Sequence, residues 1–78
     1  HLQIEPLERR LMSLLWTLSD DHGKPVEDGR LLYSPLNQEE LAMRLGVSRE
    51  SVNRALKKLE SDHKLRILKP RSFILYKM

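Results

Sequence analysis

The chain has 78 residues, a formal net charge of +3 and no cysteine. A chain of this length can bury one small hydrophobic core, which predicts a single domain over residues 1–78. The lack of cysteine excludes a disulfide scaffold, a thiolate metal site and a thiol nucleophile, and is compatible with the cytoplasm. No apolar run approaches the roughly 20 residues of a membrane span and no signal-peptide pattern is found, so no membrane association is expected.

Charge is unevenly divided along the chain. Residues 1–40 contain 4 Lys and Arg against 8 Asp and Glu, whereas residues 41–78 contain 10 against 3. The basic half should attract a phosphate backbone and bind it in a salt-dependent way. Anionic lipid or RNA would suit this charge as well, but no aromatic residue interleaves with the basic positions of residues 49–60, as a platform for single strands would require.

The first third of the chain predicts a helix, a loop and a strand. Pro6 is typical of a first helical turn, and the leucines that follow it at helical spacing predict a helix over about residues 5–19. Trp16 is expected in its core-facing side. Residues 20–29, rich in Asp, Gly and Pro, indicate a polar loop. Residues 30–36 predict a short strand, which a proline near its end confines to an edge or an exit.

The most informative pattern is that of residues 37–60, two short amphipathic helices joined by a glycine. Asn37 and Glu40 have the spacing of a capping box, in which each side chain accepts from the backbone N–H of the other. Gly46 can adopt the positive φ of a tight turn, and the small Ala42 lets a second helix cross closely. The combination predicts a helix-turn-helix.

The second helix of the motif is expected to begin after Ser48, a favourable N-cap. Its apolar residues recur at intervals of three and four and share one buried face: Val52, Ala55, Leu56 and Leu59. The outward face carries Arg49, Glu50, Asn53, Arg54 and Lys57. Guanidinium groups match the O6 and N7 acceptors of guanine, and a carboxylate can accept from the N4 amino group of cytosine. A solvated surface helix carries similar charges, but the cap, alanine and glycine at these spacings favour a DNA reader.

Two β-prone runs follow, over residues 65–68 and 73–76, with a proline at a favoured turn position between them. Such a hairpin is a wing, expected over about residues 65–77. Lys69 and Arg71 at its tip would meet phosphates, although a solvated hairpin carries such charges too. The sequence thus predicts an α+β, mainly helical fold: a winged helix-turn-helix with a three-helix core and a small antiparallel β wing.

Residues 36–60, LNQEELAMRLGVSRESVNRALKKLE, closely resemble the C-terminal DNA-binding domain of the Crp/Fnr family, bacterial transcriptional regulators of the cyclic-AMP-receptor-protein type. Residues 27–36, EDGRLLYSPL, and the leucine-rich first helix are similar to that family too. In the family, Ser-Arg-Glu-x-x-x-Arg reads a TGTGA-like half-site. The resemblance implies that Arg49 and Arg54 contact guanines and that Glu50 contacts a cytosine.

Contacts to the DNA backbone are expected around these base-reading residues. The resemblance implies them for Ser48 and Ser51 and for the amide end of the helix that starts at Asn37. Four further residues are expected to contact the DNA backbone, because they are polar and lie on the outward face or in the wing: Asn53, Lys57, Lys69 and Arg71.

The resemblance also implies a larger parent protein. Family members carry an N-terminal effector-sensing β-roll and a long dimerisation helix, and neither is found in these 78 residues. We expect this domain to act in its parent as one half of a homodimer on an inverted repeat in double-stranded DNA, with half-sites about 34 Å or a multiple of it apart. Two positions depart from the family pattern: residues 61–64 lack a glycine at the end of the recognition helix, and Pro70 stands in the wing where glycine is common.

Other functions fit the sequence less well. A winged helix can serve as a protein-docking module without groove contact, but an apolar or acidic outward face would suit that role better. The acidic residues 20–28 could touch RNA polymerase, as the corresponding loop does in some family members. His1, His22 and His63 are scattered without metal-binding or base–nucleophile spacing, so no enzyme activity, metal or cofactor is expected in this domain.

Overall fold

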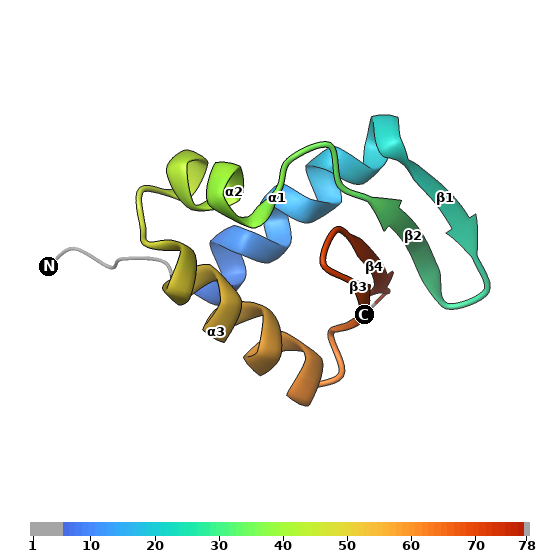
Figure 1. Cartoon of the computed structure of the whole chain (residues 1–78). Helices are drawn as coiled ribbons and strands as arrows, with labels where there is room; N and C mark the ends of the chain where they lie inside the picture. Colours follow the sequence, from blue (N-terminus) through green and yellow to red (C-terminus); the bar gives the residue numbers. More distant parts are fainter. Residues whose placement is uncertain (1–5, 78) are drawn as a thin grey trace, which may run out of the picture.

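Three helices and four strands make up residues 6–77, the part of the chain that the computed structural model describes. In chain order they are α1 (Leu7–His22), β1 (Gly23–Val26), β2 (Gly29–Tyr33), α2 (Gln38–Leu45), α3 (Arg49–Ser61), β3 (Leu65–Lys69) and β4 (Ser72–Tyr76). In Figure 1, α2 and α3 lie at one side of the molecule, the β1–β2 hairpin lies at the other, and α1 runs between them. The predicted α+β winged helix-turn-helix is confirmed.

The four strands form one antiparallel sheet in the order β1-β2-β4-β3. β3 and β4 are the predicted wing hairpin, and β2 lies beside β4 with Leu32 opposite Phe73. The strand predicted over residues 30–36 is shorter in the structure, because Pro35 and the segment before α2 leave the sheet after Tyr33. The wing is therefore joined to the rest of the sheet through β2.

The prediction of a polar loop over residues 20–29 is wrong. α1 continues to His22, three residues beyond its predicted end, and Gly23–Val26 forms the edge strand β1. Pro25 lacks an N–H, which an edge strand tolerates on the side that faces no neighbour. The predicted start of α1, at residue 5, lies outside the described residues. A local reading of composition thus missed a strand that, among residues 6–77, pairs with β2 alone.

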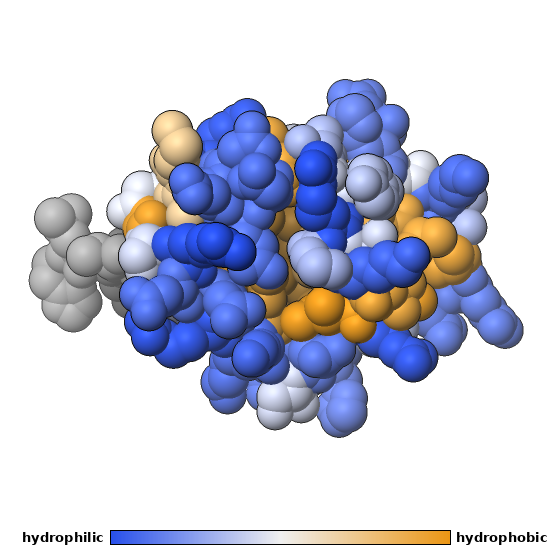
Figure 2. Space-filling view, in the orientation of Figure 1, coloured by the Kyte–Doolittle hydropathy of each residue, from blue (hydrophilic) through white to orange (hydrophobic). Residues whose placement is uncertain are grey.

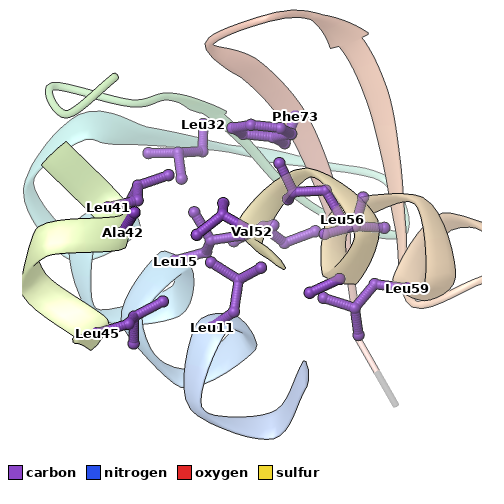
Figure 3. Packing of buried hydrophobic residues seen from close by; sticks show 13 residues of the cluster. Leu11, Leu15, Leu32, Leu41, Ala42, Leu45, Val52, Leu56, Leu59 and Phe73 are labelled. Atoms are coloured by element: carbon purple, nitrogen blue, oxygen red, sulfur yellow. The ribbon is translucent and has the colours of Figure 1, made fainter. Parts of the chain in front are cut away.

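The hydrophobic core lies where the three helices meet the inner face of the sheet (Figure 3). Its buried residues are Leu11, Leu15, Leu32, Leu41, Ala42, Leu45, Val52, Ala55, Leu56, Leu59, Leu65, Phe73 and Leu75. Full burial of one such leucine contributes about 1.5–3 kcal/mol. Trp16, expected in the core, is partly buried at its edge, where the guanidinium carbon of Arg30 stands 5.6 Å from the ring centroid.

The local signals of the helix-turn-helix are all present. Asn37 Oδ1 accepts from the Glu40 N–H at 2.8 Å, and Glu40 Oε1 accepts from the Asn37 N–H at 2.9 Å, which completes the capping box. Gly46 ends α2 in the left-handed region, at φ 72° and ψ 33°. Ser48 caps α3 by accepting from the Ser51 N–H at 3.1 Å. These contacts fix the angle at which α3 leaves α2.

The end of α3 shows how the chain turns without the glycine that the family pattern favours. His63 takes the left-handed conformation, with φ 59°. Its N–H donates to the Glu60 carbonyl at 3.0 Å, and the Lys64 N–H donates to the Leu59 carbonyl at 2.9 Å. This pair of bonds is the Schellman motif that commonly ends helices. The departure from the pattern therefore changes the residue that adopts the turn, and the motif itself is intact.

Across residues 6–77 we find no helix with the length and apolar character needed to cross a membrane.

Candidate nucleic-acid interface

The outward side of α3 presents five exposed polar side chains, which we call the reading face: Arg49, Glu50, Asn53, Arg54 and Lys57. The opposite side of the helix is buried, and both Val52 and Leu56 have 0% exposure. Within residues 6–77 no side chain of the reading face forms a hydrogen bond or an ion pair. The core thus fixes the helix, while the donors and acceptors of its outer side remain available to a ligand.

Two serines lie at the N-terminal end of the reading face. Ser48 Oγ donates to Ser51 Oγ at 2.9 Å and accepts from the Ser51 N–H at 3.1 Å. Both side chains are therefore engaged with each other at the start of α3. The free N–H groups of a first helical turn, with the helix dipole, favour an anion such as phosphate at this place.

A surface hollow of about 560 Å³ lies between the start of α2, the reading face and the wing. Its lining residues are Asn37, Gln38, Arg49, Glu50, Asn53, Pro70 and Arg71. Two of the three expected base-reading residues, Arg49 and Glu50, thus line the same hollow as three residues expected to contact the DNA backbone: Asn37, Asn53 and Arg71. Gln38, next to the helix cap Asn37, also lines this hollow and was not among the residues expected from the sequence.

Arg54 lies on the other flank of α3. Together with Ser51 and Lys58 it lines a second hollow, against Leu7 and Glu8 at the start of α1. Lys58 pairs with Asp62 at 3.4 Å, whereas Arg54 has no such partner in the described part of the chain. The three expected base-reading residues therefore lie on both flanks of the exposed side of α3. Arg49 and Glu50 face the wing, and Arg54 faces α1.

The wing tip, residues 69–71, contains the two cations expected to meet phosphate, and the structure places them differently. Lys69 is exposed at the end of β3, where it pairs with Ser72. Arg71 is half-buried: its Nη2 donates to the Pro35 carbonyl at 2.8 Å and its Nε donates to the Ser34 carbonyl at 3.1 Å. Arg71 was expected to meet phosphate at the tip, and in the structure its guanidinium is engaged with these two carbonyls.

Hydrophilic residues dominate the side of the molecule formed by α2 and α3 (Figure 2). The acidic residues Glu27 and Asp28 connect β1 to β2, at the end of the sheet where Gly29 pairs with Tyr76. The wing tip lies at the opposite end, where Tyr33 pairs with Ser72. The acidic turn is therefore separated from the wing tip by the length of the sheet.

No group of three or more His, Cys, Asp or Glu side chains that could hold a metal ion occurs among the described residues.

Comparisons with known proteins agree with this geometry. The family model described as "Crp-like helix-turn-helix domain" matches residues 9–77. The CO-dependent transcription factor CooA from Carboxydothermus hydrogenoformans is 31% identical over 87% of the chain, with a TM-score of 0.74. Oxidised CprK is 29% identical over 88% of the chain, with a TM-score of 0.70. No curated protein sequence matches significantly.

A more distant structure shares the fold. A CRP/FNR-family transcriptional regulator from Thermus thermophilus is 23% identical over 94% of the chain, with a TM-score of 0.76. The chain covers 31% of CooA, 34% of CprK and 37% of the Thermus regulator, so it spans about one third of their length. The family match extends over nearly the whole chain, including both helices of the motif and the wing. The chain therefore belongs to the Crp-like helix-turn-helix family, the DNA-binding domains of Crp/Fnr-type transcription regulators.

Proposed function

We propose that this domain reads duplex DNA sequence-specifically, with α3 in the major groove of a TGTGA-like half-site. The observation that carries the proposal is the reading face itself. Arg49, Glu50 and Arg54 are exposed on one rigid helix and have no partner within residues 6–77. A charged group without an internal partner can offer its full hydrogen-bonding capacity to a base edge.

Each residue of the triplet has a role that its chemistry suits. Arg49 and Arg54 would each donate two hydrogen bonds to O6 and N7 of a guanine, and Glu50 would accept from N4 of a cytosine. Backbone contacts come from polar groups around them: Asn37, Ser48, Ser51, Asn53, Lys57 and Lys69. No cofactor is required in this domain for such contacts, since hydrogen bonds and charge suffice.

In its parent protein the domain would act in pairs. A single copy of α3 has 13 residues, or about 20 Å of helix, which matches one half-site. Two copies related by a two-fold axis would read an inverted repeat with half-sites about 34 Å apart or a multiple of it. We further infer that the parent is a cytoplasmic transcription regulator, because its target is chromosomal DNA.

The test is a selection of the domain against randomised duplex DNA at low salt, followed by sequencing of the retained duplexes. Enrichment of a TGTGA-like pentamer is the expected result. A different enriched motif would keep DNA reading and overturn the half-site. Retention without any motif would leave only charge-driven binding, and a protein-docking module would then explain the winged helix better.

A second role is favoured by the acidic turn. Glu27 and Asp28 are exposed, and they lie at the end of the sheet away from the wing tip. A DNA-bound domain would leave this turn open to a protein, and we propose RNA polymerase as that protein. Reversal of both charges, Glu27→Lys with Asp28→Lys, should reduce activated transcription without weakening DNA binding. Unchanged transcription by a DNA-bound variant would remove the proposed contact.

A further inference from the structure

Arg71 holds the wing tip against the segment that leads into α2. Its side chain donates to the carbonyls of Pro35 and Ser34, at 2.8 and 3.1 Å. The Ser34 N–H in turn donates to the Arg71 carbonyl at 2.7 Å. The guanidinium carbon also stands 5.6 Å from the ring centroid of Tyr33. Three hydrogen bonds and a cation–π contact therefore join the wing to a segment far from it in sequence.

The segment that Arg71 contacts is itself held by hydrogen bonds. Ser34 has 0% exposure, and its Oγ donates to the Leu36 carbonyl at 2.6 Å while accepting from the Leu36 N–H at 3.1 Å. The next residue is Asn37, the N-cap of α2. Arg71 thus attaches the wing to the segment immediately before α2, the first helix of the helix-turn-helix.

The wing turn is not one of the turns that are typical of tight hairpins. Two-residue hairpin loops normally use turns with positive φ, because their twist matches that of the strands. Among the described residues only Gly46 and His63 have positive φ, so the Pro70–Arg71 loop is not such a turn. The pairing of β3 with β4 also shifts in register between Ile67 and Lys69. The tip is held from outside the hairpin, by the pairing of β4 with β2 as far as Ser72 and by the side-chain bonds of Arg71.

The position of the wing tip determines the width of the hollow between the wing and α3. Pro70 and Arg71 line one side of it, and Arg49, Glu50 and Asn53 line another. A wing that moved away from α2 would widen the hollow and carry Lys69 with it. The bonds of Arg71 are thus in a position to influence the distance between Lys69 and the reading face.

We propose that Arg71 is a positioning residue for DNA recognition, which places Lys69 so that the wing and α3 engage the same stretch of duplex. It takes this role in place of the direct phosphate contact expected from the sequence. The inference rests on the proposed function, because it concerns how the same surface meets DNA.

The first experiment is a double-mutant cycle of Arg71→Lys and Lys69→Gln, read as affinity for the selected duplex at several salt concentrations. Arg71→Lys keeps the charge but cannot make the forked pair of bonds. We expect it to weaken binding about 3- to 10-fold and to abolish the effect of Lys69→Gln in the double variant. Lys69→Gln alone should reduce the slope of log K against log salt by about 0.9. The control is Arg66→Lys, at an exposed arginine of β3 without a partner among residues 6–77.

The other outcomes overturn the proposal. Full affinity of Arg71→Lys with a loss in Arg71→Gln would show a direct phosphate contact. Additive effects of the two substitutions would show that the residues act independently. A lowered Tm with unchanged affinity, measured where all variants are folded, would show a role in stability alone.

A second measurement needs no DNA. The chain has no cysteine, so cysteines introduced at Glu39 in α2 and Lys69 in the wing can be spin-labelled specifically. Arg71→Lys should broaden the distance distribution between the labels, and Arg66→Lys should leave it unchanged. An unchanged distribution in Arg71→Lys would overturn the positioning role even if no duplex were selected. Failure of the unaltered domain to select any duplex would instead defeat the proposed function alone.

Discussion

Arg54 illustrates how much a single side chain can contribute at this surface. It is exposed, lacks a partner among the described residues, and lies on the flank of α3 away from the wing. Arg54→Ala should cost about 1–3 kcal/mol on the selected duplex and relax the preference at one guanine, because a bidentate pair with O6 and N7 is lost. Competition binding with duplexes substituted at each position measures both effects. An equal loss on selected and random duplexes would contradict base reading by Arg54.

Two residues in the left-handed region allow a matched test of backbone conformation. His63 has φ 59° and Gly46 has φ 72°, and apart from its chain neighbours no residue would lie within 4 Å of a Cβ on Gly46. His63→Gly should therefore stabilise the domain by about 0.5–1 kcal/mol, since it removes the strain of a left-handed residue with a Cβ but adds freedom to the unfolded chain. Gly46→Ala should destabilise it by about 1 kcal/mol. Thermal unfolding measures both, and shifts of the same sign would refute the explanation.

At the scale of elements, β2 and β4 approach each other closely at Gly29. A Cβ at this position would lie 1.8 Å from the carbonyl oxygen of Leu75, a backbone atom of β4 that no rotamer change can move. Gly29→Ala should destabilise the domain by at least about 2 kcal/mol. Chemical denaturation is the measurement.

The control for the strand contact is Lys24→Ala on the edge strand β1. Lys24 is exposed and pairs only with β2, so its truncation should change stability by less than about 0.5 kcal/mol. If Gly29→Ala were equally mild, the close approach of β2 to β4 would not be the reason for glycine at this position.

At the scale of the whole molecule, the separation of charge predicts which lysines contribute to the salt dependence of DNA binding. Lys57 belongs to the reading face, whereas Lys24 lies on the sheet edge farthest from β3. Lys57→Gln should weaken binding to all duplexes about equally and reduce the slope of log K against log salt by about 0.9, as expected for one lost phosphate contact. Lys24→Gln should leave the slope unchanged. A fall in the slope with Lys24→Gln would place DNA on a different face.

The recognition motif is largely determined by the sequence itself. The capping box of Asn37 and Glu40, the turn at Gly46 and the cap at Ser48 all involve residues within a few positions of each other. Short-range contacts of this kind have characteristic residue types, and helical spacing then separates the buried side of α3 from its reading face. For this reason the sequence could identify both the motif and the exposure of its triplet.

Only the tertiary structure decided the placement of β1 and of Arg71. β1 exists because β2 lies beside it, and pairing between backbones leaves little trace in the composition of a segment rich in Asp, Gly and Pro. Arg71 binds the carbonyls of Ser34 and Pro35, which are 37 and 36 residues away. Every residue has such a carbonyl, so no residue type marks the acceptor, and the fold alone brings donor and acceptor together.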